Sequence, residues 1–451
     1  MIPLERLELS QDRLPDRWYN VAPDLPRAQD EMLDPATGEQ ASDDYLERLL
    51  PSALVAQDRS IERWIAIPEK VRDAYRAWRP TPLMRARALE NYLDTPAEIY
   101  FKYEGGSPSG SHKLNSALAQ AYFAKNQGIR RLVTDTGAGQ WGSALALAGA
   151  LAGIEVGVYM VRASYHQKPY RRHLMESFGA RVEPSPGTGT EFGRKLLEQD
   201  PGHPGNEGTA VSEALEVVRA DPDSRFSMGA FANHVLLHQT VVGLEAREQL
   251  DELCREPDYL IASVGCGSNM GGFALPWVPD KLSGAVNTQI IAAEPAACAT
   301  LTKGTYRYDY PDAGGTGPMV RTYTLGHDFS PPPIHAGGLR YHGAAPLIGL
   351  LRHEGVLDAV AYQQVEVFEA ARIAARLTGL LPAPETAHAI RAVFDVARRC
   401  REERRKATIV FCWSGRGDLD LGAYGRFNAG ELRDVESFAE ERAELARGLA
   451  S

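Results

Sequence analysis

The sequence predicts an α/β protein in which parallel sheets carry helices on both faces. Two observations favour this class. Apolar strands alternate with amphipathic helices from about residue 97 to residue 413, and glycine-rich turns follow several of the strands and lead into helices. With 451 residues, the chain is long enough for two or three domains or for one large two-lobed enzyme.

Composition narrows the class of function. The hydrophobic content of 44% and charged content of 24% are ordinary for a globular protein, and the net charge of −10 argues against nucleic-acid binding. The five cysteines never show C-x-x-C spacing, which predicts reduced thiols in a cytoplasmic protein rather than disulfides or a zinc site. The first residues are too charged for a signal peptide, and no apolar run has the roughly 18 residues of a membrane span.

The N-terminal part of the chain predicts an arm, followed by a strand and a loop that ends at a lysine. Residues 1–78 are rich in proline and charge, with short helical patterns at Tyr45–Leu50 and Ile61–Trp64. A strand is expected at Ala97–Tyr103, and apolar residues at helical spacing predict a helix that starts beside Lys113. The positive end of a helix dipole would stabilise the uncharged amine that an imine needs. A lone lysine of this kind is more often a solvated surface residue.

The rest of the chain alternates in the same way. Strands are predicted at Arg131–Thr134, Ile154–Val161, Ala180–Glu183, Tyr259–Val264, Gln289–Glu294 and Ile409–Trp413. Helices are predicted at Ser143–Ala152, Tyr170–Phe178 and His234–Leu250. The segment 184–208 predicts an irregular insert, and the segment 306–341 predicts a long functional loop.

Three turns carry candidate chemistry. The turn Gly265–Asn269 follows a strand, so its backbone N–H groups predict a phosphate cradle; the third glycine of a dinucleotide fingerprint would fall at Met270, which favours a phosphorylated cofactor or sugar. The turn Thr136–Gln140, preceded by Asp135, predicts a carboxylate site. Ser414 ends the last strand at the edge where α/β sheets bind ligands. Each turn, taken alone, is also explained as a tight turn or a helix cap.

Together these motifs resemble the tryptophan synthase β chain family, which are pyridoxal-phosphate (PLP) enzymes of fold type II. The matching stretches are Ser-His-Lys-Leu-Asn at Lys113, Asp-Thr-Gly-Ala-Gly-Gln-Trp-Gly from Asp135, Gly-Cys-Gly-Ser-Asn, and Ser-Gly-Arg-Gly-Asp from Ser414. The long arm and the segments 233–239 and 335–342 resemble the longer, type-2 branch. The resemblance covers about residues 60–425, and its motifs occur in the expected order.

The resemblance implies an organisation in lobes, each with a mostly parallel sheet flanked by helices. Residues 1–78 would form the N-terminal arm, residues 79–128 and 220–425 the larger PLP-binding lobe, and residues 129–219 a smaller mobile lobe. Residues 426–451 would form a helical C-terminal tail.

The resemblance also assigns roles. Lys113 would hold PLP as a Schiff base and then move the substrate's Cα proton. His112 would lie beside the phosphate, Asn115 would bind the 3-oxygen of the ring, Glu385 would lie near the ring, and Ser414 would face its nitrogen. The phosphate would be bound by Gly265, Cys266, Gly267, Ser268 and Asn269. The carboxylate of the amino acid would be held by Thr136, Gly137, Ala138, Gly139 and Gln140.

The implied reaction is a β-replacement in which L-serine or O-phosphoserine, by way of an aminoacrylate, combines with indole to give L-tryptophan. We expect a homodimer without a stably bound α subunit, because the arm and the insert 184–208 would cover the docking face. A monovalent cation is expected from the family, and its ligands are not placed. No other metal, nucleic acid or membrane partner is expected.

Two departures from the family pattern matter. Asp135 stands where the family has a glutamate that hydrogen-bonds the indole N–H. One methylene fewer withdraws the carboxylate by roughly 1.5 Å, and misplacement of about 1 Å can cost about 10²-fold in rate. The departure motivates two alternatives, a different nucleophile or serine deamination; otherwise Asp135→Glu should leave indole activity equal or higher. Cys266 stands where glycine is usual, which is tolerable if its φ is negative. A third alternative, a binding protein that keeps only the scaffold, is disfavoured by Lys113.

Overall fold

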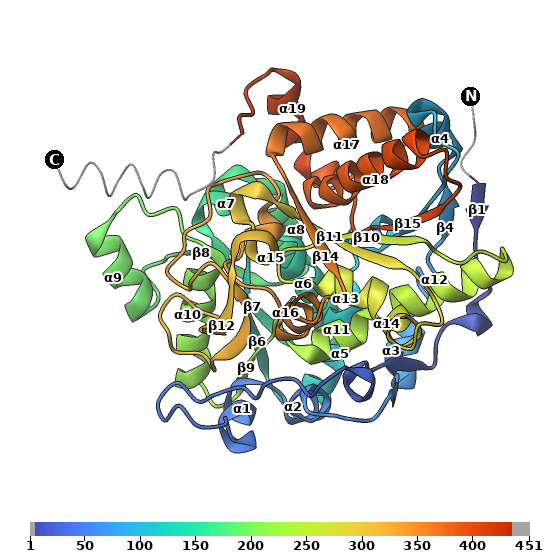
Figure 1. Ribbon diagram of the computed structural model, residues 1–451. Helices are drawn as coiled ribbons and strands as arrows, with labels where there is room; N and C mark the ends of the chain where they lie inside the picture. The colour runs from blue at the N-terminus through green and yellow to red at the C-terminus, as the bar shows by residue number, and fades with distance from the viewer. Residues whose placement is uncertain (1–4, 435–451) are drawn as a thin grey trace.

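The largest sheet forms the centre of the computed structural model, which describes residues 5–434 (Figure 1). Its seven strands lie in the order β1-β4-β5-β15-β10-β11-β14. Their bounds are β1 Glu5–Leu7, β4 Leu83–Arg85, β5 Glu98–Tyr103, β15 Thr408–Trp413, β10 Tyr259–Ser263, β11 Gln289–Pro295 and β14 Asp358–Tyr362. The strands from β5 to β14 run parallel, and β4 and β1 add an antiparallel edge.

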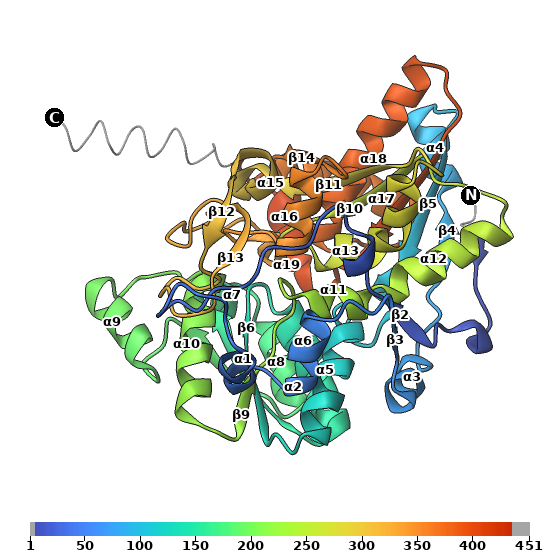
Figure 2. The same ribbon diagram turned by 60° about the horizontal axis from the view of Figure 1, so that its bottom comes forward.

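The central strand β15 shows why its sequence is apolar without interruption. Ile409 and Phe411 pack into the cluster on one face of the sheet, and Val410 and Cys412 into the cluster on the other face. Successive side chains of a strand point to opposite faces, so a strand covered on both faces is apolar throughout. The α4, α17 and α18 helices cover the first face, and α5, α11, α12 and α13 lie on the second (Figures 1 and 2). These helices span Arg87–Leu93, Gln364–Thr378 and Pro384–Glu402, then Leu114–Asn126, Asn233–Gln239, Val241–Glu252 and Ser268–Ala274.

The smaller sheet has four parallel strands in the order β8-β7-β6-β9. They span Arg181–Ser185, Glu155–Val161, Arg131–Thr136 and Ser224–Phe226. The α10 helix (Glu207–Ala220) packs on strands β6, β7 and β9, while α6 (Gln140–Ala152) and α8 (Pro169–Ser177) pack on strands of the same sheet and on each other. The predicted two-lobed α/β class is confirmed. The β9 strand joins this sheet from beyond residue 219, and the lobe boundaries and the mobility of the smaller lobe stay predictions.

Two predictions about local structure are wrong, and a third is right except at one residue. The insert 184–208 contains a helix, α9 (Glu191–Gln199), because the Thr190 hydroxyl caps it by accepting a hydrogen bond from the Gly193 N–H. The expected helix at 234–250 is two helices that meet at Thr240, whose hydroxyl accepts from Tyr19 N–H at 3.0 Å. The segment 61–64 is not helical and instead leads into strand β3.

The N-terminal arm crosses the body as an extended segment with short elements, among them the predicted helix near Tyr45. Its elements are β2 Arg17–Tyr19, α1 Asp43–Leu49, α2 Ser52–Asp58, β3 Trp64–Ala66 and α3 Glu69–Tyr75. The predicted loop 306–341 is partly a hairpin, formed by β12 and β13. The remaining elements are β12 Thr305–Asp309, β13 Val320–Thr324, α7 Arg162–Gln167, α14 Val278–Leu282, α15 Thr300–Lys303, α16 Pro346–His353 and α19 Leu421–Asn428. Of the predicted helical tail 426–451, residues 426–428 belong to α19 and residues 429–434 are not helical, and the remainder lies outside the described residues.

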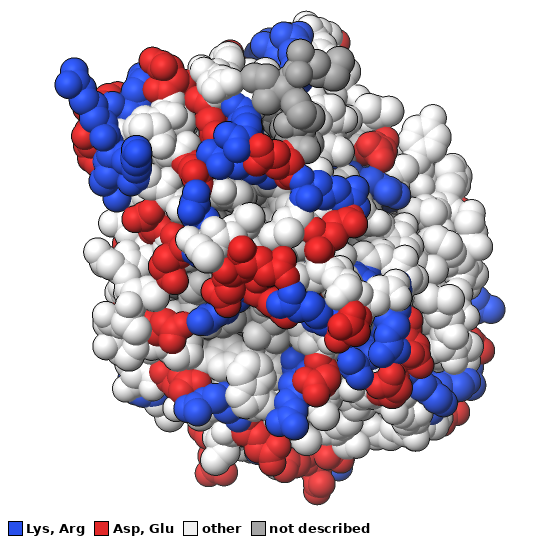
Figure 3. Space-filling model, turned by 90° about the vertical axis from the view of Figure 1, so that its right-hand side faces the viewer, with Lys and Arg blue, Asp and Glu red and all other residues white. Residues whose placement is uncertain are grey.

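Surface charge is mixed in sign. Figure 3 shows Lys and Arg interspersed with Asp and Glu on one face of the molecule. Ion pairs of this kind include Arg247–Asp280 at 2.6 Å and Arg255–Glu98 at 2.7 Å. Such interspersed charges suit a protein that acts on small molecules rather than on a polyanion. Among residues 5–434, none of the helices has both the length and the apolar character to cross a membrane.

Candidate active site

Two cavities meet at Lys113. The first, of about 530 Å³, is called the polar cavity here and is lined by His112, Ser268, Asn269, Glu385 and Ser414 among others. The second, of about 630 Å³, is called the acidic cavity and contains Asp135 and Glu207. The residues that line both cavities are Lys113, Gln140, Ala230, Cys266 and Gly338.

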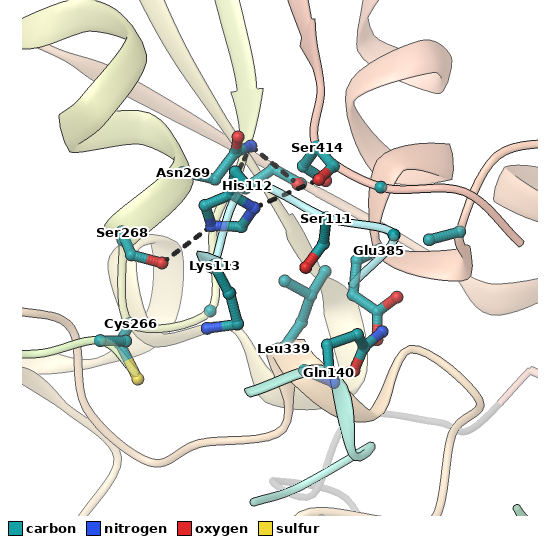
Figure 4. Close-up of a pocket in the computed structure, with 18 of the residues that line it drawn as sticks. Ser111, His112, Lys113, Gln140, Cys266, Ser268, Asn269, Leu339, Glu385 and Ser414 are labelled. Carbon is teal, nitrogen blue, oxygen red and sulfur yellow. Dashed lines mark hydrogen bonds between the residues drawn. The ribbon is translucent and has the colours of Figure 1, made fainter. Parts of the chain in front are cut away.

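His112 is an uncharged residue of the polar cavity that hydrogen-bonds two neighbouring elements (Figure 4). Burial, together with the nearby Lys113, lowers the pKa of His112 to about 3. Its Nδ1 lies 3.3 Å from the Ser414 carbonyl oxygen, which can only accept, so Nδ1 carries the proton. The Nε2 atom then accepts from the Ser268 hydroxyl at 3.1 Å. The imidazole therefore ties the start of α13 to the end of β15 without bringing a charge into the cavity.

The turn Gly265–Asn269 joins β10 to α13 and is tightly enclosed. A methyl group on Gly265 would lie 2.7 Å from the Gly338 oxygen, and one on Gly267 would lie 2.5 Å from Ile348 Cγ1. Gly267 also has φ +122°, a conformation that side chains rarely adopt. The φ angle of Cys266 is not positive, which is the condition under which a side chain is tolerated at this position. The Asn269 amide donates to Ser263, and its Oδ1 is buried without a partner among residues 5–434.

Ser414 and Glu385 complete the polar cavity from the far wall (Figure 4). The Ser414 hydroxyl lies 2.8 Å from Thr386 Oγ1, so it brings a neutral group to this wall. Glu385, in the first turn of α18, accepts from Gly338 N–H at 2.8 Å through Oε1. Its Oε2 has no partner among the described residues. Arg416 and Asp418, which follow Ser414 in the same motif, pair with each other at 3.3 Å and are exposed.

Lys113 lies at the N-terminus of α5, where the sequence placed it, and its Nζ donates to the Gly229 carbonyl oxygen at 2.9 Å. Its pKa is lowered chiefly by burial, while Cys266, Glu207, Asp135 and Glu385 act in the opposite direction. The direction of this pKa shift agrees with the sequence prediction. Its leading cause is burial, however, and the helix dipole is not among its causes. An amine with a lowered pKa is more readily available as a nucleophile.

Asn115 lines neither cavity, unlike the other predicted cofactor residues. It is fully buried, and its amide donates to Gln239 Oε1 at 3.0 Å and points toward Glu104. Glu104 is ion-paired with Arg79, and Glu245 pairs with Lys102, all of them fully buried. Asn115 thus connects the start of α5 to this charged network. Its predicted contact with the cofactor stays untested.

The acidic cavity brings together two carboxyls and the predicted loop Thr136–Gln140. Asp135 ends strand β6, and burial raises its pKa to about 7. Glu207 starts α10, and burial, with the nearby Asp135, raises its pKa to about 8. Both groups remain partly exposed to the cavity. The sequence did not point to Glu207, because an acid in the first turn of a helix is an ordinary capping feature.

One wall of the acidic cavity is apolar and aromatic. Phe231 lies there with φ +83°, a strained conformation for a phenylalanine, and its ring contacts Tyr341 edge to face at 5.7 Å between centroids. A further apolar cavity of about 740 Å³ under the N-terminal arm shares part of this wall. The shared residues are Val211, Phe226, Met228, Phe231 and Pro311.

A buried carboxylate bridges the smaller sheet's helices to the C-terminal segment. Asp420, which follows the motif at Ser414, accepts from Lys168 Nζ at 2.7 Å and from Arg171 at 3.1 Å. Both cations belong to the region of α8, and Arg171 packs directly against Gly139 of the carboxylate loop. The two partners hold the pKa of Asp420 below its usual value despite its burial.

Comparison with known proteins decides the family. Residues 75–415 match the family model described as "Pyridoxal-phosphate dependent enzyme". The chain is 54% identical to the tryptophan synthase beta chain of Thermococcus onnurineus, over 95% of this chain and 97% of that one. The chain belongs to the tryptophan synthase β chain family. Identity is also 54% with tryptophan synthase beta chain 2 of Thermotoga maritima, over 93% of this chain and 99% of that one.

Solved structures show the same fold at greater distance. A threonine deaminase of the organism abbreviated T.th. superposes with a TM-score of 0.53 at 20% identity, covering 77% of this chain and 97% of the deaminase. At this identity the likeness concerns fold alone. It agrees with the predicted fold type II architecture.

The polar cavity fits the PLP on which the family depends. The enclosed backbone N–H groups of the Gly265–Asn269 turn suit a phosphate, and the Ser268 hydroxyl can rotate its proton from His112 Nε2 toward one. The acceptors Asn269 Oδ1 and Glu385 Oε2 have no partner among residues 5–434, so a ligand would have to bring donors to them, which an ionised phosphate does not carry. Lys113, at the junction of the two cavities, is placed to hold the aldehyde.

Proposed function

We propose that this chain replaces the β-hydroxyl of L-serine with indole and so forms L-tryptophan and water. The relatives of nearly the same length are named tryptophan synthase beta chain, and the site has a separate region for each requirement of that reaction. The observation that carries the proposal is the position of Lys113, the one titratable amine that lines both cavities among the described residues.

In this proposal, His112, Ser268, Asn269 and the 265–267 backbone would hold PLP, and the Ser414 hydroxyl would face its ring nitrogen. When bound, PLP supplies an electron sink for the bonds at the substrate's Cα. The neutral hydroxyl of Ser414 does not enforce protonation of the ring nitrogen as a carboxylate would.

Lys113 then takes and returns the Cα proton, because it borders the polar cavity and the carboxylate loop alike. The backbone of Thr136–Gln140 orients the carboxylate of serine. The apolar wall around Phe231 accepts the indole ring, which meets the β-carbon on the side of Asp135 and Glu207.

The direct test is product analysis with serine and indole as the substrates. We expect tryptophan as the main product from the PLP-loaded protein and none from Lys113→Ala. Pyruvate as the main product, without tryptophan, would contradict the proposal. A competition between serine and O-phosphoserine at fixed indole decides which amino acid is preferred. Arg340 is buried beside the site, but it lines neither cavity.

The assembly expected from the sequence is proposed as well. We infer a homodimer that works in the cytoplasm without a stably bound α subunit, supported by the long arm and the α9 segment that lie on the surface of the molecule. Light scattering of the purified protein should give twice the chain mass. Co-purification of a stoichiometric second subunit from its native host would contradict this arrangement.

A further inference from the structure

Glu207 reaches the acidic cavity from the first turn of α10 and is the second carboxyl there. We propose that Glu207 recognises the ring N–H of the incoming nucleophile and so selects flat aromatic heterocycles that carry one. The inference rests on the proposed function and names the residue that holds the second substrate of that site.

Local structure fixes where Glu207 points. Asn206 caps α10 in a reciprocal capping box with Thr209, so the first turn is well defined. Glu207 and Val211 are one helical turn apart, so they share a face of α10, and both line the acidic cavity. Val211 belongs to the apolar wall. The carboxyl group therefore lies at the end of an apolar slot rather than on an open surface.

Contacts hold the carboxylate against the substrate loop. The Gly137 amide donates a hydrogen bond to it, and a methyl group on Gly137 would collide with Glu207 Oε1. Gly137 belongs to the loop that is proposed to orient the carboxylate of serine. The carboxyl group of Glu207 is thus placed between the serine site and the aromatic wall, where the two substrates must meet.

Asp135 is less suited to the same task. Its carboxylate is one methylene shorter than that of a glutamate and interacts with its own backbone N–H. Glu207 approaches from a different element and has the longer side chain. A ring N–H enclosed by the apolar wall without an acceptor would lose about tenfold to a hundredfold in affinity, as buried donors without partners do.

The charged groups around Glu207 leave one of the two acids, Glu207 and Asp135, ionised as a hydrogen-bond acceptor. Lys113 and Arg340 favour its carboxylate form, while Asp135 opposes it, so the two acids titrate as a pair and share protons near neutral pH. One carboxylate then accepts the N–H while the other acid stays protonated. The groups that interact electrostatically with Glu207 are Lys113, Asp135, Cys266, Cys298, Arg340 and Tyr341.

The test measures binding of two ring compounds, indoline and indane, which differ in having an N–H or a CH₂ at one position. Binding to the PLP-loaded protein is measured without serine, so that neither compound can react, as displacement of indole. We expect the wild type to prefer indoline by about tenfold or more, Glu207→Leu to lose that preference, and Asp135→Asn to keep most of it. Glu216→Gln, on the same helix but outside both cavities, is the matched control and should match the wild type.

Retention of the preference in Glu207→Leu, or its loss in Asp135→Asn alone, would overturn the inference. The absorbance change that serine causes without indole reports that each variant is folded and loaded. If Glu207→Leu fails that check, Glu207→Gln replaces it. Glu207→Gln should bind indoline over indane with a smaller preference, and that preference should no longer depend on pH. An unchanged preference with an unchanged pH dependence would overturn the inference. A wild type that makes no tryptophan would contradict the proposed function, whereas the binding preference is measured without turnover.

Discussion

The two cavities that meet at Lys113 are lined by different kinds of side chain, which suit different ligands. The polar cavity is lined largely by neutral groups, such as His112, which hydrogen-bonds with Ser268 and Ser414, and Glu385 is the carboxyl among its lining residues. The acidic cavity uses Asp135 and Glu207, whose pKa values are raised because burial disfavours their charge. A neutral, hydrogen-bonded region suits a permanently held group, and groups that titrate near neutral pH suit a substrate that comes and goes.

The largest expected effect comes from removing the one amine that lines both cavities among the described residues. Lys113→Ala should abolish the imine absorbance band of the bound cofactor and lower tryptophan formation by about 10³-fold or more. Lys125→Ala, on the exposed part of the same helix, is the control and should retain both. Retention of the absorbance in Lys113→Ala would show that another lysine holds the cofactor.

A smaller effect is expected in the polar cavity, where several donors act together. Ser268→Ala removes one hydroxyl, so PLP should bind about tenfold more weakly while the backbone donors remain. The ratio of indole to serine KM values should not change, because the acidic cavity is untouched. Equilibrium titration with PLP measures the first quantity and steady-state kinetics the second, with Ser283→Ala on an exposed turn as control.

Stability should depend on pH through the acidic cavity. Folding raises the pKa of Asp135 from 3.8 to about 7 and that of Glu207 from 4.5 to about 8, so the folded state binds more protons than the unfolded state between these values. The free energy of unfolding should therefore fall as pH rises through this range. Lys113, whose pKa is lowered, opposes the trend at higher pH.

Comparison with Glu207→Gln isolates that contribution. Urea unfolding between about pH 5 and about pH 8 should show a shallower decrease for Glu207→Gln than for the wild type. The Glu216→Gln variant should follow the wild type. Identical slopes for Glu207→Gln and the wild type would show that Glu207 titrates normally.

The smallest expected effect concerns Asp135→Glu, and here the structure revises the sequence-based prediction of equal or higher indole activity. Glu207 already lies in the same cavity, so a longer side chain at position 135 brings two acids closer together. We expect a decrease of a few fold for Asp135→Glu alone and recovery in Asp135→Glu combined with Glu207→Leu. Tryptophan formation at saturating serine measures both variants.

These results show where sequence reasoning was sufficient. The positions of Lys113, at the start of α5, and of the turn at Ser268, after β10, could be predicted because local sequence marks both: apolar residues at helical spacing follow the lysine, and glycines follow the strand. Glu207 could not be predicted, because its role depends on how α10 packs against the loop at Gly137, a contact between segments far apart in the chain. The position of Asn115 depends on Gln239, which binds its amide from a helix more than a hundred residues further along the chain, and local sequence does not reveal such a partner.

The Asp420 carboxylate has a consequence for how the chain tolerates proteolytic clipping. A cut after Gly417 that released the rest of the chain would leave strand β15 and Ser414 in place, since β15 ends at Trp413. It would remove the counter-ion of Lys168 and Arg171, and Arg171 supports Gly139. The clipped protein should therefore remain folded but bind amino acids more weakly.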